Sequence, residues 1–214
     1  MGNDFRELFD EWSHTYDDAV AGQDSEYAAV FARYEEILKE TASRAFGTVV
    51  EYGVGTGNLT KFLLHHADRL LGIEPSNGMR AVAKKKHPDV EILPGDFFTI
   101  PKMAGPIHCI VSTYAFHHLT DDEKEKAIGL YASILPKGGK IIFADTIFSS
   151  EEEKRKMIVE AKRKNFWRLA KDLETEFYST IPTITAMLEK HHCEVEWEPK
   201  NEFVWIMEAI KKGD

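Results

Sequence analysis

The sequence predicts an α/β fold in which helices cover both faces of a doubly wound, mostly parallel sheet. Short apolar runs rich in β-branched residues alternate along the chain with helix-like or polar segments, and this rhythm is typical of parallel strands joined by right-handed crossovers. The chain has 214 residues, of which 43% are hydrophobic and 29% charged. It is therefore long enough for one ordinary domain and a small appendage.

Helical periodicity comes first along the chain, ahead of any strand. Apolar side chains recur at helical spacing in two groups, which are Phe5, Leu8, Phe9 and Trp12, and then Tyr27, Val30, Phe31, Tyr34, Ile37 and Leu38. This spacing predicts two helices within residues 4–44. We expect residues 1–44 to form a helical cap or lid, and residues 45–214 to form a single compact domain.

Five apolar runs follow and predict the parallel strands. They are Thr48–Tyr52, Arg69–Ile73, Val90–Leu93, Ile107–Thr113 and Lys140–Asp145. Short continuous runs of this kind, each followed by a helix-like or polar segment, indicate strands that are buried on both faces of the sheet.

The C-terminal third predicts helices and then a hairpin. Glu151–Phe177 has the pattern of one long charged helix, and Pro182 is placed to begin another. Cys193–Trp197 and Phe203–Ile210 lie on either side of a turn at Pro199 and predict an antiparallel pair. The whole sheet is then seven-stranded, mostly parallel, with an antiparallel C-terminal strand.

Composition limits the partners. The 36 Asp and Glu residues outnumber the 27 Lys and Arg residues, which gives a net charge of −9 that repels a phosphate backbone. We interpret the basic stretch 154–171 as a solvated helix face. The chain has no apolar run of the roughly 18 residues a membrane span needs, and its start lacks the apolar core of a signal peptide. We therefore expect a cytoplasmic location, with neither nucleic acid nor membrane as partner.

A glycine loop follows the first predicted strand. Gly53, Gly55 and Gly57 stand between an apolar strand and an apolar-periodic helix, and glycine permits positive φ and close approach of a ligand. Dinucleotide sites favour G-x-G-x-x-G, but the position of its third glycine holds Asn58. Glu51, two residues before the first glycine, suits a ligand ammonium group better than a pyrophosphate.

Acidic residues also end the second and third predicted strands. Glu74 closes the run RLLGIE, where a carboxylate can accept both hydroxyls of a ribose. Asp96, in EILPGDFF, offers an acceptor for an exocyclic amine, and Phe97 beside it offers an apolar wall for a purine. Three acidic residues at adjacent strand ends predict a site for a nucleoside that carries a cationic tail.

The segments VVEYGVGTGN, GIEPS, PGDFF, CIVSTYAFHHL and LPKGGKIIFAD resemble, in this order, the motifs of class I S-adenosylmethionine-dependent methyltransferases. The whole chain is similar to small bacterial YrrT-like methyltransferases. The resemblance implies a Rossmann-like fold, S-adenosylmethionine as cofactor, and transfer of a methyl group to a small-molecule acceptor with release of S-adenosylhomocysteine. The cofactor-binding residues that it implies are Tyr16, Glu51, Gly53, Gly55, Thr56, Gly57, Asn58, Glu74, Pro75, Ser76, Met79, Asp96, Phe97, Ser112, Thr113 and His117.

The resemblance also extends to the N-terminus. An F-x-x-W-x-x-x-Y-D segment, which runs from Phe9 through Trp12 and Tyr16 to Asp17, corresponds to part of the family's lid. One departure is Tyr52, which is bulkier than the residue that the family often has at this place.

The adjacent histidines His117 and His118 are candidate general bases, because a neutral imidazole accepts a proton near neutral pH. They could equally cap or pack the end of the fourth strand. We expect no metal site, because no third His, Cys or acidic ligand stands nearby at helical or finger-like spacing, and zinc needs at least three protein ligands.

Two alternatives to an enzyme that methylates a small molecule remain at this point. One is a non-catalytic sensor that binds S-adenosylmethionine or S-adenosylhomocysteine. The other is an NAD-dependent oxidoreductase, which Asn58 and Asp96 disfavour. The sequence leaves open the acceptor, the choice between O, N, S and C as nucleophile, and the choice between monomer and homodimer.

Overall fold

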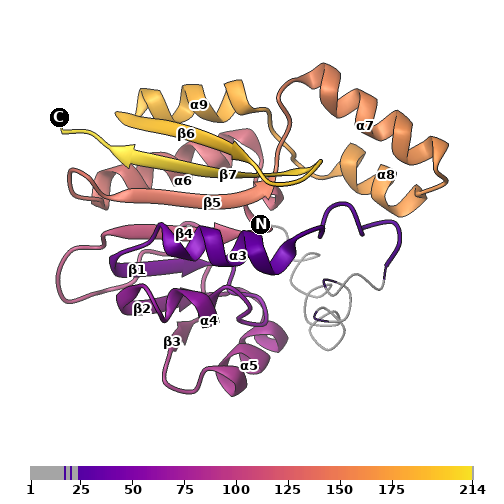
Figure 1. The fold of residues 1–214 in the computed structure, drawn as a ribbon. Coiled ribbons are helices and arrows are strands. Elements are labelled where there is room, and N and C mark those ends of the chain that lie inside the picture. The colour runs from indigo at the N-terminus through magenta and orange to yellow at the C-terminus, as the bar shows by residue number, and fades with distance from the viewer. Residues whose placement is uncertain (1–16, 18–19, 21–23, 214) are drawn as a thin grey trace.

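The computed structural model describes residues 17, 20 and 24–213 (Figure 1). Its centre is one seven-stranded sheet with the order β3-β2-β1-β4-β5-β7-β6. The strands are β1 (Gly47–Tyr52), β2 (Ala67–Ile73), β3 (Glu91–Leu93), β4 (Cys109–Thr113), β5 (Lys140–Thr146), β6 (Cys193–Pro199) and β7 (Val204–Lys211). All seven predicted strands are confirmed.

Strand directions also agree with the prediction. The first five strands pair in parallel, whereas β7 runs antiparallel to both β5 and β6. The order reverses between β1 and β4, and a doubly wound sheet opens a crevice at the carboxyl ends of its strands where this happens. The fold therefore predicts a ligand site at the ends of β1 and β4.

The central strands are buried because helices cover both faces of the sheet. One face packs α3 (Tyr34–Ser43) and α4 (Thr60–Leu63) against alternate residues of β1, β4 and β5. The opposite face packs α6 (Asp121–Ile134) and α9 (Ile181–Lys190) against the residues between them. α5 (Asn77–Lys86) packs beside β3 at the sheet edge. Cys109 and Cys193 are both free and buried.

The predicted helix over Tyr27–Leu38 is only partly correct. The helix α3 begins at Tyr34, because Arg33 takes a left-handed backbone conformation with a φ of 62°. Residues before it form turns, and Tyr27 and Val30 pack into an apolar cluster with the C-terminal helices. The periodicity had correctly indicated buried side chains but not the local backbone. The separate cap at residues 1–44 stays a prediction, since most of residues 1–23 lie outside the described residues.

The single helix predicted over Glu151–Phe177 is wrong. The chain forms α7 (Glu151–Arg163) and α8 (Trp167–Thr175), which fold back on each other. Asn165 has a φ of 61°. Its N–H donates to the carbonyl of Lys162, and the N–H of Phe166 donates to the carbonyl of Ala161. These two bonds make a Schellman ending for α7. Folding back buries the apolar faces of both helices, which one straight helix would leave in water.

The Schellman ending gives a stability prediction. We expect Asn165→Ala to lower the free energy of unfolding by about 1 kcal/mol, because an alanine pays the steric cost of the left-handed conformation. Asn165→Gly is expected to be neutral or slightly stabilising for the same reason. Urea unfolding of the two variants checks this. Equal stability of the alanine and glycine variants would contradict it.

α9 begins at Ile181, with Pro182 in its first turn and the Thr180 side chain accepting from the N–H of Thr183. The predicted start at Pro182 is thus confirmed to within one residue. Among the described residues, no helix combines the length and the apolar character needed to cross a bilayer.

Candidate functional site

A cavity of about 730 Å³ lies at the carboxyl ends of β1, β2, β3 and β4. Most of the residues that the sequence proposed line it together, and these are Gly53, Gly55, Thr56, Asn58, Glu74, Pro75, Met79, Asp96, Phe97, Thr113 and His118. They come from four separate strand ends, so the parallel sheet itself assembles the site.

Two positions of the glycine loop require glycine, for different reasons. Gly53 has a φ of 66°, and a Cβ on it would stand 2.7 Å from the Cβ of Ala115, at the end of β4. Gly55 has a φ of 56° but no atom within 4 Å of its would-be Cβ. Gly53 therefore lets the loop pass close to β4, and Gly55 leaves open space in the cavity wall.

Glu74 is fixed by backbone donors from two loops. Its Oε2 accepts from the N–H of Gly55 at 2.9 Å, and its Oε1 accepts from the N–H of Ser76 at 2.8 Å. The residue is only 5% exposed. These two bonds fix the carboxylate just after β2, in the wall of the cavity.

Asp96 and Phe97 form the wall that the sequence assigned to a purine. Phe97 is buried and stacks on Tyr52 with ring centroids 5.8 Å apart. The Tyr52 hydroxyl donates to the carbonyl of Thr99, and the Tyr131 hydroxyl donates to that of Phe97. The unusual Tyr52 is thus a support behind this wall.

Glu51 does not line the cavity. Its buried carboxyl group accepts from the Thr60 hydroxyl at 2.7 Å, at the start of α4. Burial raises the pKa of Glu51 to about 8, and the nearby Glu74 adds to the rise. Glu51 is therefore mostly protonated at neutral pH, and in this structure it contacts the glycine-loop helix rather than the cavity. Its role toward a ligand ammonium group stays a prediction.

Three other proposed residues stand just behind the cavity wall. A Cβ on Gly57 would stand 2.7 Å from the ring of His87, so this glycine allows close packing of the loop against α5. Ser76 caps α5 by accepting from the N–H of Met79. Ser112 is buried in β4, and its hydroxyl has no hydrogen-bond partner among the described residues. Tyr16, with Phe9 and Trp12, lies outside the described residues.

Five lining residues were missed by the sequence analysis. They are Tyr34, Val54, Leu59, Tyr114 and Ala115. Tyr114 follows β4 with a φ of 52°, and its ring lies 5.2 Å from that of Tyr34. No periodicity signals such a left-handed residue, although a bulky side chain in this conformation is rare and worth attention near a functional site.

Asp17 contacts two side chains of the glycine loop and a lysine of α5. Its Oδ1 accepts from the Thr56 hydroxyl at 2.6 Å and from the Asn58 amide at 3.0 Å, and its Oδ2 pairs with Lys86 at 2.5 Å. These contacts hold the pKa of Asp17 below its usual value, against the opposing effect of burial. Asp17 thus positions two side chains of the cavity wall.

We expect Asp17→Asn to weaken S-adenosylmethionine binding about tenfold, because Thr56 and Asn58 lose a charged acceptor worth about 1.5 kcal/mol. Titration calorimetry measures the change. Asp89→Asn, at an exposed acidic residue after α5, is the control that is expected to bind like the wild type. An unchanged affinity in Asp17→Asn would show that the Asp17 contacts do not act on the cavity.

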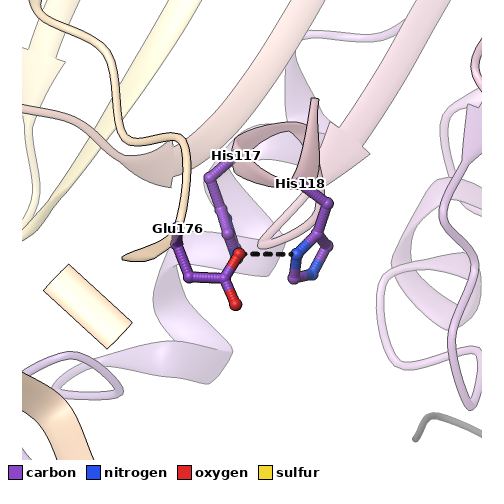
Figure 2. Close-up of side chains that lie close together, drawn as sticks. All are labelled: His117, His118 and Glu176. Atoms are coloured by element: carbon purple, nitrogen blue, oxygen red, sulfur yellow. Dashed lines mark hydrogen bonds and ion pairs between the residues drawn. The ribbon is translucent and has the colours of Figure 1, made fainter. Parts of the chain in front are cut away.

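The two histidines occupy a short 3-10 helix, η2 (Phe116–His118), where they meet Glu176 (Figure 2). The Nδ1 of His117 lies 2.6 Å from Asp145 Oδ1, and the Nδ1 of His118 lies 3.2 Å from Glu176 Oε2. The two imidazole rings are 4.2 Å apart. Each histidine thus has its own carboxylate partner, one from the end of β5 and one after α8.

The pKa values of the two histidines are shifted in opposite directions. Burial acts to lower the pKa of His117, but the Asp145 carboxylate outweighs it and the pKa is raised. Burial and then the charge on His117 lower the pKa of His118, although Glu176 opposes them. His117 therefore favours the protonated state, and His118 the neutral state that accepts a proton. His118 also lines the cavity, whereas His117 does not.

Within the described part of the chain, His117, His118 and Glu176 form the one group whose potential metal ligands lie within 4.8 Å of one another. No sequence pattern indicated Glu176, because it stands 58 residues after His118 and only the fold brings it close. The expectation that no metal is bound stays a prediction. Elemental analysis of the purified protein is expected to find less than one equivalent of zinc, and a stoichiometric metal would contradict it.

Known proteins provide three comparisons. The family described as "Methyltransferase domain" matches residues 49–139. An uncharacterised methyltransferase of Bacillus cytotoxicus is 52% identical over 215 residues, which cover 99% of this chain and 100% of that protein. Magnesium protoporphyrin IX methyltransferase from Synechocystis PCC 6803, solved with bound S-adenosylhomocysteine, has a TM-score of 0.71 at 12% identity and covers 97% of this chain and 98% of its own. That last likeness shows a shared fold.

The relative at 52% identity spans both chains almost completely, so its family is also the family of this chain. The strand order and the glycine loop at the β1 end agree with that assignment. The narrower similarity to YrrT-like proteins stays a prediction. The chain belongs to the methyltransferase family.

Proposed function

We propose that this methyltransferase transfers the methyl group of S-adenosylmethionine to a small-molecule acceptor and releases S-adenosylhomocysteine. The observation that carries the proposal is one cavity of about 730 Å³ in which Gly55, Glu74, Asp96 and His118 share the wall. When bound, the cofactor supplies a methyl group that its sulfonium already activates. The protein's residues then have to hold, orient and shield the reactants, and alignment alone contributes up to about 7–11 kcal/mol.

The residues present fit this cofactor. Glu74 offers two fixed carboxylate oxygens to the ribose hydroxyls, as described above. Asp96 and Phe97 offer an acceptor and an apolar wall to the adenine, and the open face of Gly55 gives room for the rest of the molecule. The dinucleotide alternative loses its support, because Asn58 stands where a third glycine is needed and the family is that of methyltransferases.

His118 is the residue placed to accept a proton from the acceptor. It lines the cavity, Glu176 contacts its Nδ1, and burial together with the neighbouring His117 lowers its pKa. A positioned base is needed by a protonated nucleophile such as a hydroxyl group, whereas a neutral amine needs only alignment. His117 and Asp145 act through His118, as groups that set its protonation state.

This arrangement predicts the pH dependence. His118 has a lowered pKa and acts when neutral, so kcat/KM is expected to fall as the pH drops below the ordinary histidine value. His117→Gln removes the positive charge beside it, so the pKa of His118 rises and this acid limb moves to higher pH. Steady-state rates between about pH 5 and 9 measure the limb. A limb that stays in place or moves to lower pH would contradict the assigned roles.

A small acceptor is favoured by charge. The net charge of −9 repels nucleic acid. The prediction that the protein is a monomer or a homodimer stays untested. Light scattering of the purified protein distinguishes the two states.

The test is incubation of the protein with methyl-labelled S-adenosylmethionine and a cell extract that has been separated into small-molecule and macromolecular fractions. We expect label in the small-molecule fraction and formation of S-adenosylhomocysteine. Label that appears only in macromolecules would overturn the small-molecule assignment. Tight cofactor binding without any turnover would instead favour the sensor alternative.

A further inference from the structure

A second cavity lies beside η2, which contributes side chains to the walls of both cavities. His118 lines the first cavity and His117 lines the second, and their rings are 4.2 Å apart. A molecule in the second cavity therefore lies one histidine pair away from the cofactor. A methyl acceptor held in the second cavity would reach the cofactor past this histidine pair.

The walls of the second cavity are mostly aromatic and aliphatic. They combine side chains from η2, β5, β6, β7 and α9, namely Phe116, Phe143, Ile184, Trp197, Trp205 and Met207. The indole N–H of Trp197 already donates to the hydroxyl of Thr185 at 3.0 Å. Such walls favour an apolar or aromatic ligand body, which gains by leaving water.

The one lysine at this cavity is already fully engaged. Lys124 is 3% exposed, and its ammonium group contacts Ser179 Oγ at 2.6 Å, Asp121 Oδ1 at 3.5 Å and the carbonyl of Phe177. An ammonium has three donors, so these three acceptors use all of them. Burial lowers the pKa of Lys124 despite Asp121. Lys124 therefore has no further N–H to offer an anionic ligand, and the ring of His117, which also lines this cavity, is paired with Asp145.

The one carboxylate at this cavity is engaged as well. Asp145 accepts from the backbone N–H groups of His117 and Thr146, and it pairs with the His117 ring. A cationic ligand would have to compete with His117 for this carboxylate. Because both charges are satisfied within the protein, a charged ligand body would lose its hydration without gaining a partner.

We propose that the second cavity holds the body of the methyl acceptor, and that this body is uncharged and apolar or aromatic. The inference rests on the proposed function and names its substrate class. The acceptor's nucleophilic group lies at the end of the body that is next to His117 and His118.

The probe for this cavity is 4-fluorophenol, with 4-fluorobenzoate as a charged molecule of similar shape. Both are followed by ¹⁹F NMR in protein saturated with S-adenosylhomocysteine. We expect 4-fluorophenol to bind at least about tenfold more tightly than 4-fluorobenzoate. Binding of the benzoate with equal or greater affinity would overturn the proposal, and so would a lack of binding by 4-fluorophenol.

A cavity-filling substitution locates the binding. Ile184 projects from α9 into this cavity only, so Ile184→Trp is expected to weaken 4-fluorophenol binding at least about tenfold and leave S-adenosylmethionine affinity within about threefold. Glu189→Trp, on the exposed side of the same helix, is the matched control and is expected to bind both like the wild type. Unchanged phenol binding in Ile184→Trp would overturn the proposal.

A second measurement needs no substitution, in case the tryptophan disturbs folding. Intermolecular nuclear Overhauser effects are expected between 4-fluorophenol and the indole protons of Trp197 or Trp205, and contacts confined to other residues would overturn the proposal. Failure here is distinguishable from failure of the proposed function. If the proposed function is wrong, the protein does not bind S-adenosylmethionine or does not transfer the label, whichever cavity 4-fluorophenol occupies.

Discussion

Glu74→Ala is expected to weaken S-adenosylmethionine binding at least about 100-fold, which equals about 2.7 kcal/mol. The carboxylate is nearly buried and held by the N–H groups of Gly55 and Ser76, so it meets the ribose hydroxyls without further ordering. Hydrogen bonds to a charged group are worth about 1.5–3 kcal/mol each, and two are lost. Titration calorimetry with the purified protein measures the effect.

Two variants separate binding from folding. Glu74→Gln keeps the side-chain length but loses the charge and one acceptor oxygen, so an intermediate loss of affinity is expected. Glu91→Ala removes an exposed acidic residue from the neighbouring strand β3 and is expected to bind like the wild type. Thermal unfolding of each variant shows how much of the loss of S-adenosylmethionine affinity comes from destabilisation of the glycine loop. Wild-type affinity in a folded Glu74→Ala protein would remove the ribose assignment.

His118→Asn is expected to lower kcat by about 10²–10⁴, the usual contribution of a positioned acid or base. The affinity for S-adenosylmethionine is expected to stay within about threefold, because Glu74, Asp96 and the glycine loop are untouched. Rates with the acceptor identified by labelling, together with calorimetry of the cofactor, separate the two effects. His118 thus differs from Glu74, whose loss acts on binding first.

The matched control is His66→Asn, which changes an exposed histidine far from η2 in sequence and is expected to leave kcat unchanged. Glu176→Gln keeps His118 but removes the carboxylate that contacts its Nδ1. A smaller loss of kcat is expected there, because the ring is less firmly oriented but still able to accept a proton. If His118→Asn retains the wild-type rate, the reaction needs alignment alone and His118 merely lines the cavity.

The strands and most of the cofactor cavity followed from the sequence, because buried parallel strands leave a continuous apolar signal. Ile107–Thr113 was predicted and Cys109–Thr113 formed, a difference confined to the strand's start. The helices were less predictable. Arg33 and Asn165 adopt left-handed conformations that no apolar periodicity encodes, so one helix begins late and another is divided in two.

By itself, the sequence determined that Gly53, Glu74 and Asp96 meet, because each follows a strand and parallel strands bring their carboxyl ends to one edge of the sheet. Only the tertiary structure decided which histidine faces the cofactor cavity and that Glu176 contacts it. The same holds for the second cavity, whose walls combine side chains of η2, α6, β5, α9, β6 and β7. Strand ends obey a regular geometry that a sequence pattern encodes, whereas contacts between distant helices and loops depend on how whole elements pack.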